Sequence, residues 1–306
     1  MTVTTRTALG FWLADANRLR LRSPEYSYAV SDDPITIRPL ETRAEYTACV
    51  ALQRDIWGVD FLDVVPATIL MVSQQVGGVA SGAFDPNGRL LGFVFGVSGV
   101  RDGVMAHWSD MLAVREHVRD TGLGARLKQY QRDQVLARGV ESMYWTFDPL
   151  QSRNAYLNFN KLGIVVREYV RDMYGDTDSP LHQGVGTDRF IALWQMSSDR
   201  VVARLAGSER GPESPSRDAH RVLDSHGVDG MLRPGEPDLG SRNHRLLVTI
   251  PSDISEIMER SLDVALEWRG ATRAVFTHYL DEGYEARELL RSGATSEYLL
   301  ERRPES

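Results

Sequence analysis

A glycine-rich turn between a predicted strand and a predicted helix is the stretch whose residue types and spacing point most directly to chemistry. The strand ends in Met111-Leu-Ala-Val114, and the turn is Arg119-Asp-Thr-Gly-Leu-Gly124. The first backbone N–H groups of a helix have no partner within it, and the helix dipole adds partial positive charge there. Glycines at 122 and 124 let a ligand approach the backbone. The turn therefore predicts a site for a phosphate or pyrophosphate group.

Other phosphate-binding motifs fit this turn less well. A dinucleotide fingerprint needs a third glycine where Leu127 stands, and an acidic residue at a strand end ~20 positions later. A P-loop needs Gly-Lys-Ser/Thr, which does not follow. Taken alone, the six residues also fit a tight turn with a capping glycine, so the surrounding elements have to decide.

Hydrophobic periodicity places this turn within an α/β pattern. Strands are predicted over 35–40, 79–84, 89–100, 104–114, 142–147, 165–170 and 189–196, with helices over 41–57, 66–76, 122–138 and 152–163. Asp85-Pro-Asn-Gly88 is typical of a hairpin turn. The predicted order is β-α-α-β-β-β-α-β-α-β-β.

A second motif lies in the last of these helices, Ser152-Arg-Asn-Ala-Tyr-Leu-Asn-Phe-Asn-Lys-Leu-Gly-Ile164. The turn at 119–124 and this helix, in this order of elements, resemble the GNAT superfamily of N-acetyltransferases. The superfamily patterns are Gln/Arg-x-x-Gly-x-Gly/Ala and Asn-x-x-Ala-x-x-x-Tyr-x-Lys-x-Gly-Phe. The second motif matches at Ala155, Lys161, Leu162 and Gly163, and departs at Ser152, Phe159 and Ile164.

The resemblance implies an α/β fold with a mixed, mostly antiparallel sheet flanked by helices. The sheet would splay near its fourth and fifth strands, where coenzyme A inserts. The implied reaction is direct transfer, in a ternary complex, of an acetyl or other short acyl group from acetyl-CoA or another acyl-CoA to an amine. No metal is implied.

The same resemblance assigns the residues that would bind coenzyme A. The backbone N–H of Leu112 would serve the acyl oxygen, and Val114 would pair with the pantetheine arm. The pyrophosphate would be held by Gly122, Leu123, Gly124, Ala125 and Arg126. The remaining expected contacts are Ala113, Arg119, Asn154, Asn158 and Lys161.

Proton transfer needs an acid and a base, and the tyrosine that often serves as the acid in the superfamily is replaced here. Phenylalanine at 159 stands where the superfamily often has a tyrosine that protonates the thiolate, so Tyr156 is the predicted substitute. Side chains alternate along a strand, which puts His107 and Asp110 on opposite faces. The resemblance favours Asp110 as the base, because it lies two residues before Leu112, where related enzymes often have a catalytic histidine or another polar group. Simple packing of the tyrosine and a structural role for the aspartate remain the alternatives.

Three further candidates are His182 and Arg189, in the loop before the last strand, and Arg153, in the predicted helix 152–163. His182 has an imidazole suited to removing an ammonium proton, although a lone loop histidine is more often solvated. Arg153 and Arg189 would bind a carboxylate on the acceptor or on a dicarboxylic acyl group. Their alternative is a structural or surface ion pair.

Composition sets the broad class. The chain has 306 residues, 42% hydrophobic and 25% charged, with a net charge of −7, which makes nucleic acid a poor partner. Its one cysteine, Cys49, cannot form an internal disulfide, which fits the cytoplasm. The longest apolar stretch, 90–100, falls short of the ~20 residues that span a bilayer, so no membrane is expected.

Composition also divides the chain. We expect an N-terminal extension over 1–33, an acyltransferase domain over 34–197, a Gly/Pro-rich linker or loop over 198–244, and a C-terminal β-α-β-β unit over 245–303. This last unit cannot bury both faces alone, so it should dock on the first domain or on a second subunit in a homodimer.

With that unit, the chain resembles a branch of predicted bacterial acyltransferases with an appended half-domain. A small amine or amino acid is the expected acceptor, with succinyl as one acyl option. The alternative, motivated by Phe159, is a catalytically silent acyl-CoA-binding or regulatory module.

Overall fold

The computed structural model describes residues 26–29, 34–59, 61–119, 121–175, 184–208 and 218–304. Its strands are β1 (Tyr26–Ala29), β2 (Pro34–Pro39), β3 (Val79–Phe84), β4 (Leu90–Arg101), β5 (Val104–Val114), β6 (Ser142–Phe147), β7 (Val165–Val170), β8 (Arg189–Gln195), β9 (His220–Leu223), β10 (Ser225–Val228), β11 (Met231–Pro234), β12 (Arg245–Pro251), β13 (Tyr284–Ser292) and β14 (Thr295–Arg302). Its helices are α1 (Arg43–Trp57), α2 (Ala67–Gln75), η1 (Glu116–Val118), α3 (Leu123–Leu136), α4 (Ser152–Tyr156), η2 (Leu157–Leu162), α5 (Asp199–Leu205), α6 (Ile254–Arg260) and α7 (Leu262–Asp281).

Twelve of these strands form one sheet in the order β1-β2-β3-β4-β5-β6-β8-β7-β13-β14-β12-β9. Neighbours run antiparallel except β5 with β6 and β12 with β9, which run parallel. The expected mixed, mostly antiparallel sheet flanked by helices is confirmed. The predicted strands 104–114 and 142–147 coincide with β5 and β6.

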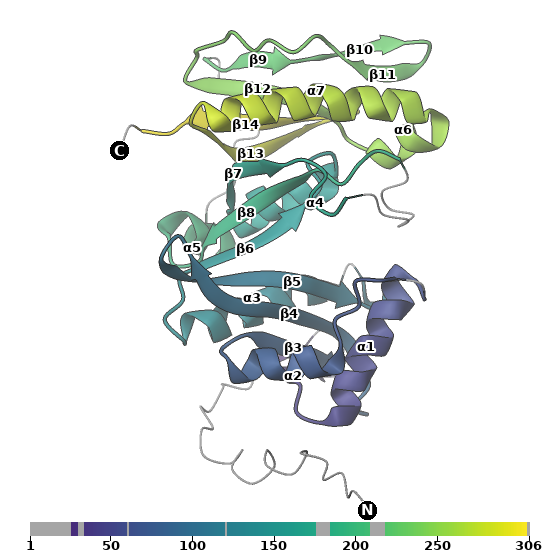
Figure 1. The fold of residues 1–306 in the computed structure, drawn as a ribbon, viewed down its shortest axis with the longest axis vertical. Helices are drawn as coiled ribbons and strands as arrows, with labels where there is room; N and C mark the ends of the chain where they lie inside the picture. The colour runs from purple at the N-terminus through teal and green to yellow at the C-terminus, as the bar shows by residue number, and fades with distance from the viewer. Residues whose placement is uncertain are drawn as a thin grey trace, which may run out of the picture.

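Helices cover both faces of the first half of this sheet, with α1 and α2 on one face and α3 on the other (Figure 1). Alternation along β4 explains the two cores. Phe93 and Phe95 pack with the residues of α1, whereas Val94 packs with Leu127 of α3. The sheet between them is therefore buried on both sides at β3 and β4.

Side-chain caps determine where several helices begin. Thr42 and Glu45 form a reciprocal capping box at the start of α1. The expected C-terminal β-α-β-β unit has one helix, but the structure has two in its place. Asp253 caps α6, and Ser261, in extended conformation, accepts from the Val264 N–H and starts α7.

The C-terminal unit continues the same sheet at the end of the molecule opposite α1 and α2 (Figure 1). It has the expected order of a strand, helical segments and two strands, and it docks on the first part of its own chain. The backbone contact is one residue pair, Ala286 with Val166, between β13 and β7. We call this junction the β7/β13 seam.

Side chains complete the seam. Arg269 of α7 makes two hydrogen bonds to Asp148, of 2.9 and 2.6 Å, and Arg204 of α5 donates to Glu288 at 2.6 Å. The segment 198–244, expected to be a linker or loop, contributes α5 and the short strands β9 to β11. Part of that segment therefore packs into the seam.

Of the expected extension over 1–33, the structure describes Tyr26–Ala29, which pairs with β2 as strand β1. Among the described residues, no helix combines the length and apolarity required to cross a membrane.

Candidate active site

The central feature of the site is a gap between two neighbouring strands. Strands β5 and β6 pair in parallel at three positions only, from Ala106 with Ser142 to Trp108 with Tyr144. Beyond that point β5 runs on against β4 to Val114, and β6 runs on against β8 to Phe147. The two strands therefore part, as expected from the resemblance. We call the point where they part the apex.

The edge of β5 that faces this gap carries backbone groups without a strand partner. The Arg115 N–H donates to the Leu91 carbonyl at 2.8 Å, which identifies that pair as hydrogen-bonded. Hydrogen-bonded and non-hydrogen-bonded pairs alternate in an antiparallel ladder, so Leu112 and Val114 lie in non-hydrogen-bonded pairs with β4. Their N–H and C=O groups therefore point into the gap.

A β-bulge interrupts β5 next to the apex. Phe95 pairs with Met111 and Gly96 with Ser109, which leaves Asp110 as the extra residue. Gly96 is required at this point, because a Cβ there would lie 2.4 Å from His107 Nε2 and 2.5 Å from the Trp108 carbonyl oxygen. The bulge re-aims Asp110 and reverses which face the following residues occupy.

At the open end of the gap stands the N-terminus of α3. Gly122 is its N-cap, with a left-handed φ of 83°, no side-chain cap and no acidic residue in the first turn. A Cβ at Gly122 would meet nothing within 4 Å, and one at Gly124 would meet only Leu112 and Val114 of β5. These features fit a bound pyrophosphate, because first-turn N–H groups face open space beside the β5 edge.

The arginines of this region donate to protein carbonyls with their side chains. Arg119 Nε lies 3.4 Å from the Val114 carbonyl, and Arg126 Nη2 donates to the Ile35 carbonyl of β2 at 3.2 Å. The Arg126 side chain therefore joins α3 to β2, and its backbone N–H donates to the Gly122 carbonyl at 3.1 Å, so these donors of Arg126 are engaged within the protein.

The two candidates for the base lie on opposite faces of β5. His107 is fully buried against α3, with Nδ1 2.9 Å from Ser98 Oγ and Nε2 3.0 Å from Gln131 Nε2. Burial, aided by the charge of Lys128, lowers the pKa of His107 to about 3. The imidazole is therefore neutral and committed to the interior.

Asp110 is exposed on the face of α1 and α2. Desolvation by the surrounding protein, followed by the negative charge of Asp63, raises the pKa of this carboxyl group above its ordinary value. Asp63 lies in the connection between α1 and α2, so that connection passes near the bulge. A carboxylate with a raised pKa next to a strand opening is a suitable proton acceptor.

Helices α4 and η2 border the other side of the gap. Phe159 is fully buried in an aromatic cluster with Phe147 and Tyr298. Its neighbour Asn158 accepts from Trp145 Nε1 at 3.3 Å, and the buried Nδ2 of Asn158 has no hydrogen-bond partner. That unused donor on the β6 side of the gap fits a ligand carrying amide or thiol groups.

Tyr156 lies among the C-terminal strands, with the guanidinium of Arg291 in β13 at 5.3 Å from its ring centroid and Lys161 Nζ at 5.9 Å. Asn154 and Lys161 are exposed on this helical segment. The proposed substitute for a tyrosine at 159 is thus placed toward the C-terminal unit.

Arg153 is exposed on α4, whereas Arg189 is buried at the start of β8. Arg189 donates to the Asp188 carbonyl at 2.9 Å, and its guanidinium lies 5.3 Å from the Tyr174 ring centroid. Only 7% of the Arg189 side chain is exposed, which leaves little of it for a substrate. His182 lies outside the described residues.

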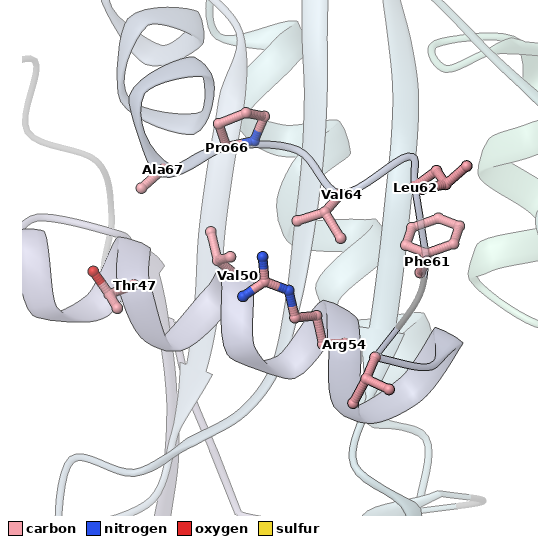
Figure 2. Close-up of a pocket in the computed structure, with 9 residues that line it drawn as sticks. Thr47, Val50, Arg54, Phe61, Leu62, Val64, Pro66 and Ala67 are labelled. Carbon is pink, nitrogen blue, oxygen red and sulfur yellow. The ribbon is translucent and has the colours of Figure 1, made fainter.

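A surface pocket of about 680 Å³ lies between α1 and the connection that contains Asp63. Figure 2 shows Arg54 of α1 extending between Val50 and Val64 into this pocket. The pocket combines an apolar wall with a cation, so it suits a small molecule with a carboxylate and an apolar group.

Sequence reasoning missed Lys128 and Trp145, which meet at the apex. Lys128 is buried on α3, with Nζ 2.7 Å from Ser109 Oγ and 3.9 Å from the Trp145 ring centroid. The available signal was a polar side chain next to Leu127 on the apolar stripe of the helix. Among the described residues, no group of three or more His, Cys, Asp or Glu side chains is placed to hold a metal.

Comparisons with known proteins give structural neighbours only, since no family model and no curated protein matches the chain. An acetyltransferase of the GNAT family from Streptococcus pneumoniae is 17% identical over 52% of this chain and 97% of its own, with a TM-score of 0.41. An aminoglycoside 6'-acetyltransferase is 18% identical over 53% and 97%, with a TM-score of 0.42.

A third neighbour, an alanine N-acetyltransferase of a ribosomal protein from Escherichia coli, is 20% identical over 54% of this chain and 97% of its own, with a TM-score of 0.41. All three are acetyltransferases, and one is named as a member of the superfamily that the sequence motifs resemble.

Proposed function

We propose that this protein is an acyl-CoA-dependent N-acyltransferase that moves an acetyl or other short acyl group to a small amine or amino acid. The observation that carries the proposal is the gap between β5 and β6, lined by the backbone groups of Leu112 and Val114 and ending at the uncapped N-terminus of α3. An extended amide-containing arm and a pyrophosphate need these two features in this order.

Within this gap, each part of an acyl-CoA would meet chemistry that suits it. The β5 edge would pair with the pantetheine amides, and the first turn of α3, from Leu123 to Ala125, would hold the pyrophosphate. The Leu112 N–H would stabilise the acyl oxygen as negative charge develops on it. The unpartnered Asn158 Nδ2 is a further donor on the β6 side.

On the other face, Asp110 and the pocket beside Asp63 would receive the acceptor. Asp110 would take the proton that an ammonium must lose before its nitrogen can attack. Arg54 in the pocket supports an acceptor that carries a carboxylate, as an amino acid does. The nitrogen–carbon bond then forms and the carbon–sulfur bond breaks within one ternary complex, without an acyl-enzyme.

Ligand stabilisation tests the binding half of this proposal. Free CoA, acetyl-CoA and succinyl-CoA at ~100-fold their dissociation constants should each raise the free energy of unfolding by about 2.7 kcal/mol. The acyl form with the lowest dissociation constant identifies the donor. No stabilisation by any of the three would contradict the proposal.

Turnover separates an enzyme from the second candidate, a silent acyl-CoA-binding module. Phe159 motivates that alternative, because phenylalanine cannot protonate a thiolate. Thiol release from the best-binding acyl-CoA with a pool of amines and amino acids, abolished by Asp110→Ala, supports the enzyme. Binding without thiol release for any amine favours the module.

A further inference from the structure

The apex holds one of the two lysines of the chain. Lys128 and Lys161 are the only lysines among its 35 lysine and arginine side chains. Lys161 is exposed and Lys128 is buried. An arginine holds its proton at every physiological pH, whereas a buried lysine can exchange its proton near neutrality. The one interior lysine stands where the proposed thioester would lie.

Contacts place the Lys128 ammonium between the two parting strands. Ser109, which accepts from Nζ at 2.7 Å, is the first residue of β5 beyond its last pair with β6. Trp145, whose ring centroid lies 3.9 Å from Nζ, is the first residue of β6 beyond the same pair. Nζ therefore bridges the apex on the α3 face.

The hydrogen-bond chain behind Lys128 has a single consistent direction. Gln131 Nε2 donates to His107 Nε2, so its oxygen is the acceptor for the Ser109 hydroxyl at 2.8 Å. Because the Ser109 hydroxyl donates its proton to Gln131, it can only accept from Lys128. The remaining hydrogens or lone pair of Nζ are left for the Trp145 ring and for a ligand group at the apex.

The groups that face Nζ leave it without a counter-ion. On β5 the titratable neighbour is His107, which is neutral, and Asp110 lies on the opposite face. Trp145 on β6 and Asn158 on η2 carry no charge. Among the described residues, Lys128 makes no ion pair, and burial lowers the pKa of its ammonium to about 7.

Neither position 159, where the superfamily often has a tyrosine, nor the predicted substitute Tyr156 supplies a proton donor at the apex. Phe159 has no hydroxyl, and Tyr156 lies near Arg291 in β13. A departing thiolate in a gap lined by protein still needs a proton or a positive charge. Lys128 is the proton donor that the described residues place at the apex.

We propose that Lys128 is a catalytic residue that delivers a proton from Nζ to the sulfur of coenzyme A as the thioester breaks. This inference rests on the proposed function. As the nitrogen–carbon bond forms, the carbon–sulfur bond breaks and its electron pair stays on sulfur. The proton passes from the ammonium to sulfur, which gives the free thiol and a neutral amine. The acceptor ammonium gives one proton to Asp110 before attack and a second to solvent as the amide forms, and solvent returns a proton to Nζ.

Lysine-selective carbon-13 NMR tests this placement without turnover, because the protein gives only two lysine signals. The signal of Lys128 is titrated in the free protein, with CoA and with desulfo-CoA, which lacks the sulfur. A neighbouring thiolate stabilises the ammonium, so CoA should shift the Lys128 titration to higher pH than desulfo-CoA does. The exposed Lys161 is the reference signal in the same sample.

Kinetics provide the second arm. Lys128→Met should lower kcat by roughly a hundredfold or more and abolish the fall of activity above neutral pH that loss of the Lys128 proton causes. Gln134→Met places the same side chain further along α3 and should leave kcat within about twofold of wild type. Urea unfolding confirms that both variants are folded.

The outcomes separate the two proposals. If neither CoA nor desulfo-CoA stabilises the protein, the proposed function fails. If both bind and the Lys128 signal titrates identically with each, the lysine does not face the sulfur and this inference is overturned. Unchanged kcat in folded Lys128→Met overturns it as well.

Discussion

Asp110 owes its exposure to the bulge in β5, and its proposed role can be tested by removing the charge alone. Asp110→Asn keeps the shape of the side chain but cannot accept the ammonium proton. We expect kcat/KM to fall by about 10² to 10⁴. Steady-state thiol release measures this loss, and CoA binding to the variant should be unchanged. A loss below about threefold would assign the proton to another group.

Asp63 provides the matched variant. Its negative charge contributes to the raised pKa of Asp110, so Asp63→Asn should lower that pKa. The base is deprotonated above its pKa, and therefore the acidic limb of the kcat/KM profile should move to lower pH. An unmoved limb in this variant would mean that the limb does not belong to Asp110.

Lys128 also predicts how stability depends on pH. Its pKa falls from 10.5 in the unfolded chain to about 7 in the folded protein, so the unfolded state binds more protons between these values and stability rises with pH there. Lys128→Met should therefore raise the free energy of unfolding most below pH 7. The gain should shrink toward pH 10.5. Urea unfolding across this range measures the difference, and a pH-independent difference would contradict it.

The sequence predicted the elements that position the candidate site, whereas the contacts of its side chains depend on residues far apart in the chain. The positions of Leu112, Val114 and Gly122 follow from a strand, a turn and a helix in succession, which are local patterns. Lys128 was missed because its burial depends on Ser109 and Trp145, which come from two other strands. Asn158 is predicted as a contact of coenzyme A, but the lack of a hydrogen-bond partner for its Nδ2 is visible only in three dimensions.

Helix α3 permits a comparison of its two ends. Gly122 and Gly139 flank it with φ values of 83° and 76°, and a Cβ at either would meet nothing within 4 Å. Alanine at each position should cost about 1–2 kcal/mol of stability, because the left-handed conformation is unfavourable for it. Only Gly122→Ala should also weaken CoA binding, by calorimetry. Equal binding by the two variants would remove the first turn of α3 from the site.

Among the elements, those with strong periodicity were predicted well, and those shaped by capping or by short pairing were not. Strands β5 and β6 coincide with their predicted ranges. The break at Ser261 was missed, since the apolar spacing continues through it while the side chain caps the next helix. Strands β9 to β11 are four residues each, among glycines and prolines, and too short to show a period.

For the whole molecule, the Arg269–Asp148 ion pair tests whether contacts across the β7/β13 seam stabilise the fold. Both side chains are nearly buried, at 5% and 11% exposure. Arg269→Met therefore leaves the Asp148 carboxylate with the Leu150 N–H at 2.8 Å and, as its nearest described cation, Arg189 at 4.0 Å. Unfolding should become easier by about 3–5 kcal/mol. Arg233→Met, in β11, removes an exposed ion pair with Glu267 of α7. It should lower the free energy of unfolding by at most about 1 kcal/mol. Similar losses of stability in the two variants would contradict a structural role for the buried Arg269–Asp148 pair.

This pair also shows why the sequence left the docking of the C-terminal unit open. Arg269 and Asp148 are 121 positions apart, and nothing in the local pattern of either predicts the other. The apolar faces of the unit showed that it needed a partner surface. They carried no information on whether that surface belonged to the same chain or to another copy.

The parting of β5 from β6 gives the interior of a twelve-stranded sheet a property normally confined to its rim. Open backbone groups at Leu112 and Val114 are a template on which any extended chain can pair, as at an edge strand. The pantetheine arm, with its two amides, would serve as the missing strand. Acyl-CoA would then act as a guard against aggregation as well as a substrate, and the ligand-free protein would be the form most prone to self-association on concentration.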